Sequence, residues 1–161
     1  MLNNPNLNAS IKININQIDK FEHLKNFVSK INLGDGRITM RDFKTLWNES
    51  VFIRSNEIEF LNDMDGKKLV GEVTFNFEDI EKFFRYFQIK RNYRDVFDKI
   101  RLDFVYDLTL DKLTMNNLKI DNKSFEKIDE FINQYNKSKS NLLNKVTIRN
   151  FIKEFFQVYA G

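Results

Sequence analysis

Apolar and polar residues alternate along several segments of this chain, and this two-residue period constrains its fold more than any other feature. The longest run is 102–110, in which every second residue is apolar, and shorter runs occur at 11–15, 38–40, 58–60 and 73–77. Successive side chains of a β-strand point to opposite faces of a sheet, so each run predicts a strand with one apolar face. The sequence therefore predicts an antiparallel, one-sided amphipathic β-sheet that is open like a groove.

A first hairpin is predicted around Asp65-Gly66, because this dipeptide supplies the positive φ angles of a two-residue turn. The turn would join the strand that contains Ile58 to the strand that contains Val73. Centred on Asp65-Gly66, it places Ile58 opposite Val73, and both side chains then lie on the same face of the sheet.

A second hairpin is predicted at Asp111-Lys112, after the 102–110 run. This turn would pair Leu108 with Met115. The apolar residues then change from odd to even positions at Leu118, and one extra residue in the strand would restore the buried face. The sequence therefore predicts a β-bulge at Asn116-Asn117.

Further segments carry apolar residues at intervals of three and four, the spacing of one face of an α-helix. Ser124 and Thr147 are the expected N-caps of the last two helices, and a break is expected near 88–92. Strands and interspersed amphipathic helices together predict an α+β fold with a C-terminal helix. The helices are predicted over 21–31, 80–87, 93–100, 125–135 and 147–160.

The chain of 161 residues predicts a single domain over 1–161. Residues 11–21 align without a gap on residues 73–83 at an offset of 62, which indicates an internal repeat of 11–72 and 73–135. A polar loop is predicted over 137–144. The first ten residues contain neither the charged nor the apolar part of a secretion signal. Two alternatives stay open, a cytosolic protein or a fragment of a longer one.

Enzyme activity is not expected, because the sequence contains none of the common catalytic or phosphate-binding motifs. The single histidine, His23, lies off the apolar stripe of its predicted helix, which favours a solvent-facing position. The chain has no cysteine, so thiolate metal sites and Cys-based catalysis are excluded. No cofactor or metal is expected. The longest apolar runs are three residues, far below the roughly 20 that cross a bilayer.

The segment 82–101 interleaves basic and aromatic residues, as single-stranded nucleic-acid binders do. However, its aromatic residues fall at core spacing, and acidic residues dilute the charge. The net charge of +3 also has a simpler source in codon usage, because the sequence is rich in Lys, Asn, Ile, Phe and Tyr, all of which have AT-rich codons. We favour a buried aromatic stripe with a solvated basic face. Nucleic-acid binding through Arg91 and Arg94 is the weakest hypothesis.

The predicted strands and helices all carry apolar faces. Burying an apolar surface away from water stabilises a protein by about 25 cal/mol per Å², so these faces are expected to be covered. Two arrangements satisfy this requirement. In the first, the chain's own helices cover the sheet and close an ordinary α+β core. In the second, part of the apolar sheet face stays open as a trough, and lipid acyl chains cover it.

A resemblance to a known family favours the second arrangement. The segments 68–77, 84–93, 100–108 and 113–121, with the ending 145–161, resemble the C-terminal region of AsmA-family proteins from AT-rich alphaproteobacteria. The resemblance implies a periplasmic, β-rich groove, anchored in the inner membrane by an N-terminal helix, that transports phospholipid or supports outer-membrane assembly. This sequence has no such anchor, so the resemblance also implies a fragment of a larger protein.

This lipid-handling hypothesis predicts a groove lined by the apolar strand residues. The final helix would cap the groove or dock on a partner through Phe151, Phe155 and Tyr159. The main alternative is an interaction scaffold, with envelope proteins as its partners. The same strand residues are the expected core in the first arrangement, so this set of residues does not distinguish a covered sheet from an open trough. They are Ile11, Ile13, Ile15, Ile58, Phe60, Val73, Phe75, Phe77, Leu102, Phe104, Tyr106, Leu108, Met115 and Leu118.

Overall fold

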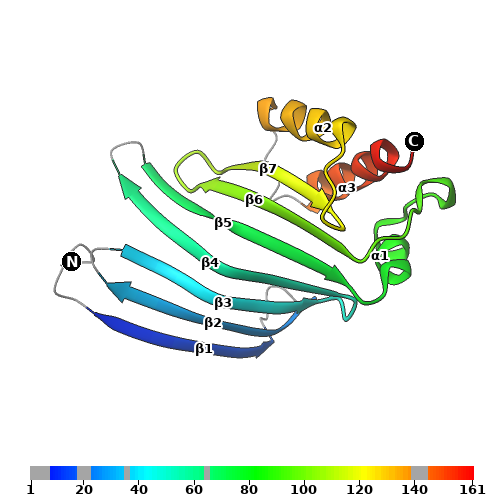
Figure 1. Ribbon diagram of the computed structural model, residues 1–161. Helices are drawn as coiled ribbons and strands as arrows, with labels where there is room; N and C mark the ends of the chain where they lie inside the picture. Colours follow the sequence, from blue (N-terminus) through cyan, green and yellow to red (C-terminus); the bar gives the residue numbers. More distant parts are fainter. Residues whose placement is uncertain (1–7, 18–22, 35–36, 64–65, 139–144) are drawn as a thin grey trace.

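The computed structural model describes residues 8–17, 23–34, 37–63, 66–138 and 145–161. Seven strands form one sheet in which each strand pairs antiparallel with the next along the chain (Figure 1). The strands are β1 (Ala9–Gln17), β2 (Leu24–Gly34), β3 (Arg37–Trp47), β4 (Val51–Asp63), β5 (Gly66–Phe77), β6 (Lys99–Asp107) and β7 (Lys112–Ile120). The helices are α1 (Ile80–Phe87), the short 3-10 helix η1 (Arg91–Tyr93), α2 (Glu126–Lys137) and α3 (Lys145–Ala160).

The sheet is one-sided. Residues paired directly across antiparallel strands point to the same face, so the register gives the composition of each face. The predicted α+β class, with an open antiparallel amphipathic sheet and a C-terminal helix, is confirmed. One row on the apolar face contains Ile11, Ile31, Met40, Ile58, Gly71, Phe104 and Met115. One row on the opposite face contains Lys44, Arg54, Thr74, Arg101 and Lys119.

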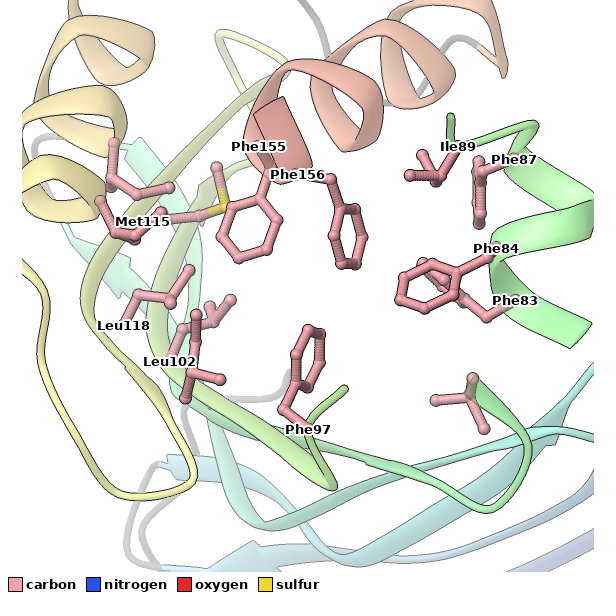
Figure 2. Close-up of a cluster of buried hydrophobic side chains, with 14 residues drawn as sticks. Phe83, Phe84, Phe87, Ile89, Phe97, Leu102, Met115, Leu118, Phe155 and Phe156 are labelled. Atoms are coloured by element: carbon pink, nitrogen blue, oxygen red, sulfur yellow. The ribbon is translucent and has the colours of Figure 1, made fainter. Parts of the chain in front are cut away.

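The helices cover only part of the apolar face. α2 packs on β7 and α3, and α3 also contacts α1 and η1, so the helices gather at the β5–β7 side of the sheet (Figure 1). The core lies beneath them, where Phe83, Phe84 and Phe156 of the helices meet Leu102 and Met115 of the sheet (Figure 2). Phe84 and Phe156 are fully buried, and their ring centroids lie 5.1 Å apart in an edge-to-face contact.

Helix α1 begins and ends close to the predicted residues. Asp79 is its N-cap, and the Asp79 Oδ1 atom accepts a hydrogen bond from the Lys82 N–H at 2.8 Å. Gln88 ends the helix in the left-handed region with φ 56°, which confirms the predicted break. Trp47, at the end of β3, anchors the helix, because its ring stacks on Phe87 at 5.5 Å.

The predicted helix over 21–31 is wrong in the part that the structure describes, where residues 24–34 form β2. Asn26 has a positive φ of 53° at a bulge, and the extra residue shifts the alternation of the strand. Leu24 and Phe27 therefore reach the apolar face three residues apart, and Ile31 follows four residues later. A bulged strand thus imitates the spacing of a helix.

The predicted helical piece over 93–100 is also wrong. Residues 91–93 form only η1, residues 94–98 are irregular and Ile100 belongs to β6. The Asp121 Oδ1 atom accepts hydrogen bonds from the N–H groups of Asp98 at 3.1 Å and Lys99 at 2.9 Å. Together with pairing to β5 and β7, these bonds hold the segment extended and override its helical spacing.

The first predicted hairpin exists, but its turn is displaced by one residue. Asp63 pairs with Gly66, and residues 64 and 65 between them lie outside the described residues. Ile58 consequently faces Gly71 instead of Val73. The face of the sheet was predicted correctly, because a shift of two residues in register preserves the side of every side chain.

The second predicted hairpin also exists, and its turn begins earlier than predicted. Asp107 pairs with Lys112, so the connection contains four residues, 108–111. The Asp107 Oδ1 atom accepts hydrogen bonds from the N–H groups of Thr109 at 2.8 Å and Leu110 at 2.9 Å, which bends the chain there. Leu108 therefore does not pair with Met115.

The predicted bulge in β7 is confirmed. Asp103 pairs with Asn116, whereas Arg101 pairs with Lys119, so β7 contains one extra residue at this point. Asn117 carries it with a positive φ of 51°. The bulge returns Leu118 to the buried side of the sheet.

The last two helices start at other residues than predicted. Phe125 is the N-cap of α2 and no side chain caps the helix, so Ser124 is not its cap. α3 begins at Lys145, which places Thr147 inside its first turn. Residues 139–144 of the predicted polar loop lie outside the described residues. At the offset of 62, β1 corresponds to β5 and β2 to residues 86–96, and the repeat stays a prediction about the sequence.

Candidate functional site

The helices divide the apolar face of the sheet into a covered half and an open half. The covered half comprises the strand side chains that belong to the buried cluster or pack against it. Helices pack on this part of the sheet, where Leu102, Met115 and Leu118 are buried and the other strand side chains are partly buried against the cluster. The predicted groove residues found in the covered half are Val73, Phe75, Phe77, Leu102, Phe104, Met115 and Leu118.

The open half consists of apolar side chains on the same face that lie outside the buried cluster. It extends over β1 and β2, the part of β3 before Trp47, the last part of β4 and the first part of β5 (Figure 1). At the other ends of β3 and β4, Trp47 and Val51 belong to the buried cluster or pack against it. Each of its side chains keeps part of its surface exposed. The open half contains Ile11, Ile13, Ile15, Phe27, Ile31, Leu33, Ile38, Met40, Phe43, Ile58, Phe60 and Leu69. It therefore includes the predicted groove residues of β1 and β4.

Hydroxyl side chains lie among these apolar residues without offering hydrogen bonds to a ligand. Ser29, Thr45 and Ser55 are buried, and each hydroxyl donates to a backbone carbonyl oxygen at 3.0–3.2 Å. The bulges of β2, β3 and β4 lie beside them, and a bulge leaves backbone groups outside the regular ladder. The hydroxyl groups satisfy such carbonyl groups, and the accessible surface of the open half stays apolar.

Two predicted groove residues lie at the margin of the face. Tyr106 points to the apolar side, opposite Leu69 and Leu113. Its hydroxyl donates a hydrogen bond to the Asp111 carboxylate, which raises the pKa of Tyr106 to about 12. Leu108 lies beyond the end of β6, in the turn to β7, and is 42% exposed. Leu108 is therefore not part of the sheet face.

The residues predicted to dock a partner face the inside of the molecule. Phe155 is only 3% exposed. The Phe151 ring lies 4.7 Å from that of Tyr135 in α2, and the Tyr159 ring lies 5.5 Å from that of Phe125. Burial is the main reason why the pKa of Tyr159 is raised. This stripe of α3 thus holds α2 in place and is not free for another protein.

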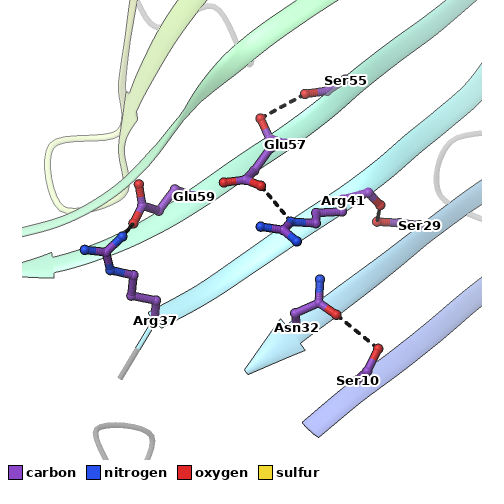
Figure 3. A network of polar contacts seen from close by, with 8 residues as sticks. All are labelled: Ser10, Ser29, Asn32, Arg37, Arg41, Ser55, Glu57 and Glu59. Atoms are coloured by element: carbon purple, nitrogen blue, oxygen red, sulfur yellow. Dashed lines mark hydrogen bonds and ion pairs between the residues drawn. The ribbon is translucent and has the colours of Figure 1, made fainter. Parts of the chain in front are cut away.

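The polar face of β1–β4 carries an open hollow of about 830 Å³. Its charged side chains form pairs (Figure 3). The Arg41 Nε atom lies 2.6 Å from the Glu57 Oε2 atom, and an Arg37 nitrogen lies 3.9 Å from a Glu59 oxygen. The four charges cancel, so this hollow does not favour an ionic ligand of either sign.

The basic and aromatic segment 82–101 folds largely as a buried stripe with charges outside. The aromatic residues of α1 pack in the core, and Arg94 donates to Glu81 at 3.1 Å while its guanidinium lies over the Phe84 ring. His23 is exposed in the turn before β2. Within the part of the chain that the structure describes, no group of His, Asp or Glu residues could hold a metal ion.

Comparisons with protein-family models, with curated proteins and with solved structures find no match for this chain. The helices of the described ranges include none that is both long and apolar enough to cross a bilayer. The open half of the apolar face is the candidate site because of its position outside the buried cluster.

Sequence reasoning missed several members of the open half. The spacing of Phe27 and Ile31 predicts a helix, and no pattern in the sequence assigns Phe43 to an element. A usable signal was present, because Asn26 and Asp42 separate apolar runs of opposite phase, and each has a φ of 53° in the structure. An Asn or Asp between two out-of-phase runs indicates a bulged strand.

Proposed function

We propose that this chain binds lipid acyl chains on the open half of its apolar face and catalyses no reaction there. The observation that supports this most is the continuous, partly exposed apolar surface from β1 to β5, which lies outside the helix-covered core. Contiguous apolar surfaces on soluble proteins commonly mark interaction sites. A hydrocarbon ligand would cover this surface, and each Å² of apolar surface removed from water contributes about 25 cal/mol to the binding free energy.

The dimensions of the open half fit an acyl chain. One apolar row crosses five strands from Ile11 in β1 to Gly71 in β5, through Met40 and Ile58. Neighbouring strands lie about 4.8 Å apart, so this row is about 19 Å long. The hydrocarbon of one bilayer leaflet is about 15 Å thick. An extended acyl chain can therefore lie along the row over most of its length.

The chemistry of the surface also favours hydrocarbon over a polar ligand. The hydroxyl groups of Ser29, Thr45 and Ser55 already donate to backbone oxygens. A polar ligand placed over them would lose its hydrogen bonds to water and gain none, which costs free energy. An acyl chain has no such groups to satisfy.

A polar substitution on the open half tests the proposal. Met40→Gln replaces an apolar side chain with a polar one of similar length. It should weaken the binding of a fatty acid that carries an environment-sensitive fluorophore about fivefold, because roughly 1 kcal/mol of apolar contact is lost. Thr39→Gln is the matched control, since Thr39 is the neighbouring residue in β3 and points to the polar face.

The fluorescence titration has clear outcomes against the proposal. Failure of the unaltered protein to bind the fatty acid would overturn it, as would an equal loss of affinity in Met40→Gln and Thr39→Gln. Mass spectrometry of an organic extract of the purified protein provides a second readout, and co-purified lipid would support the proposal.

The AsmA resemblance extends this proposal to a cellular role. We propose that the chain acts as the lipid-handling module of a larger periplasmic envelope protein, which an N-terminal helix anchors in the inner membrane. Phospholipid transport or outer-membrane assembly would be the process it serves. Recovery of the native protein in the cytosolic fraction of its cells would contradict this role, while leaving acyl-chain binding to be decided by the titration.

A further inference from the structure

The two edges of the sheet differ in how they are protected. At the β7 edge, the side-chain amide of Asn136 in α2 takes the place of a neighbouring strand. Its Oδ1 atom accepts from the Met115 N–H at 3.0 Å, and its Nδ2 atom donates to the Met115 carbonyl oxygen at 2.6 Å. At the opposite edge, β1 pairs only with β2 among the described residues. An uncovered edge strand offers a row of backbone groups for pairing with another strand.

The side chains of β1 also lack most of the features that block edge pairing. The strand contains no proline and no acidic residue, and Lys12 is its one charged residue. Two isoleucines at this edge stay in water, with Ile11 51% exposed and Ile15 40% exposed. A neighbouring strand with matching side chains would cover both of them.

We propose that β1 pairs antiparallel with β1 of a second copy of this chain, centred on Ile13. The segment Ile11-Lys12-Ile13-Asn14-Ile15 reads with the same apolar and polar pattern in both directions. In the proposed register, Ile13 lies opposite Ile13 of the second copy and Ile11 lies opposite Ile15. Lys12 lies opposite Asn14 of the second copy, so no like charges face each other.

Neighbouring registers are less favourable for physical reasons. If the register between the two β1 strands shifts by one residue, or by any odd number of residues, isoleucines lie opposite polar residues and the two faces of the sheet are mixed. Centring the pair on Lys12 sets two lysines opposite each other, and like charges directly across strands are destabilising. Centring it on Asn14 sets Ile11 opposite Gln17. The register centred on Ile13 is the one that matches every isoleucine of β1 with another isoleucine.

The proposed dimer is isologous and therefore has a two-fold axis. Antiparallel pairing of the two β1 strands within one continuous sheet sets this axis perpendicular to the sheet. This axis keeps the apolar faces of both copies on the same side. The two open halves would then join across the β1 strands, and the helices of each copy would lie at the outer ends. The inference stands on the strand edge alone and does not rest on lipid binding.

Disulfide cross-linking tests the register directly, because the natural chain has no cysteine. Ile13→Cys places the new thiol opposite itself in the second copy. Ile11→Cys is the matched control, since it changes the same residue type on the same face of β1 but lies opposite Ile15. We expect Ile13→Cys to form a covalent dimer under mild oxidation much faster than Ile11→Cys. Equal rates would overturn the proposed register.

Sedimentation over a wide concentration range tests the dimer itself and uses charge instead of the isoleucines. Asn14→Lys creates two Lys-Lys pairs per dimer and should raise the dissociation constant about tenfold. Adding Lys12→Glu to this variant turns both pairs into opposite charges and should restore association. Asn16→Lys adds the same charge to the same strand face, but opposite Ser10, and should change the constant little.

The sedimentation results can also refute the dimer. A natural chain that stays monomeric at every concentration would overturn it, as would equal weakening by Asn14→Lys and Asn16→Lys. Because none of these measurements involves lipid, a failure of acyl-chain binding and a failure of dimerisation are separate results.

Discussion

Asparagine and aspartate residues supply most of the left-handed backbone in this molecule. Among the described non-glycine residues, positive φ angles occur mainly at Asn and Asp, including Asn26, Asp42, Asn48 and Asn117. These side chains tolerate the left-handed region better than other residues with a Cβ atom. The high asparagine content, which looks like a compositional bias in the sequence, therefore has structural use in bulges and turns.

Glu49 gives a pH-dependent prediction at the residue scale. It lies in the β3–β4 turn, 2.6 Å from the Lys25 ammonium and 3.4 Å from that of Lys82. The hydrogen bond from Lys25, followed by that from Lys82, lowers the pKa of Glu49 below its ordinary value of 4.5. A carboxyl group whose pKa is lowered by folding stabilises the protein above its unfolded-state pKa. This contribution is lost as pH falls through the folded-state pKa.

The measurement is urea unfolding at a series of pH values. Below pH 4.5, the ordinary pKa of the group, the unfolding free energy of the natural protein should fall more steeply with acid than that of Glu49→Gln. Glu130→Gln, at an exposed position of α2, serves as the control and should keep the natural slope. Identical slopes for the natural protein and Glu49→Gln would contradict the prediction.

At the scale of elements, regular alternation was a reliable guide and interrupted alternation was not. β1, β6 and the β7 bulge follow from the sequence, because side chains there keep a strict phase up to one identifiable insertion. β2 could not be assigned in the same way, since its bulge at Asn26 produces helical spacing. The turn after β6 depends on hydrogen bonds to the Asp107 carboxylate, which a period-two pattern does not encode.

The β7 bulge gives a prediction at this scale. Asn117 has φ 51°, and its Nδ2 atom donates to an Asp103 carboxylate oxygen at 2.6 Å. Asn117→Val puts a β-branched residue into the left-handed region, and the strain should lower the unfolding free energy by about 1–2 kcal/mol. Thr114→Val changes an ordinary position on the polar face of the same strand and should stay within about 0.5 kcal/mol. A similar small effect for both variants, measured by urea unfolding, would argue against strain at the bulge.

At the scale of the whole molecule, the sequence identified the apolar face but not which part of it is covered. The two-residue alternation of apolar residues is the same in a strand that a helix covers and in a strand that borders an open trough. The division depends on how α2 and α3 fold back over β5–β7, and contacts such as that between Phe131 and Phe151 decide it. Helical periodicity gives the apolar side of a helix but not the strands that it will meet.

The division into a covered and an open half predicts unequal stability effects. Phe156 is fully buried between Phe84 and Phe97, so Phe156→Ala should lower the unfolding free energy by about 3–5 kcal/mol. Ile31→Ala, on the open half, should cost only about 1–2 kcal/mol, because its side chain already keeps part of its surface in water. Chemical denaturation of both variants checks this, and equal losses would mean that the open half is packed as tightly as the core.

The sequential order of the strands has a consequence for folding kinetics. Each strand pairs with its neighbours along the chain, so most pairings close short loops and lose little chain entropy before contacts form. The aromatic core lies at the β5–β7 side. We therefore expect the folding nucleus to form there and the remaining strands to pair one after another toward β1. We expect β1 to form last and to fray first, so association of two chains through this strand would follow folding instead of guiding it.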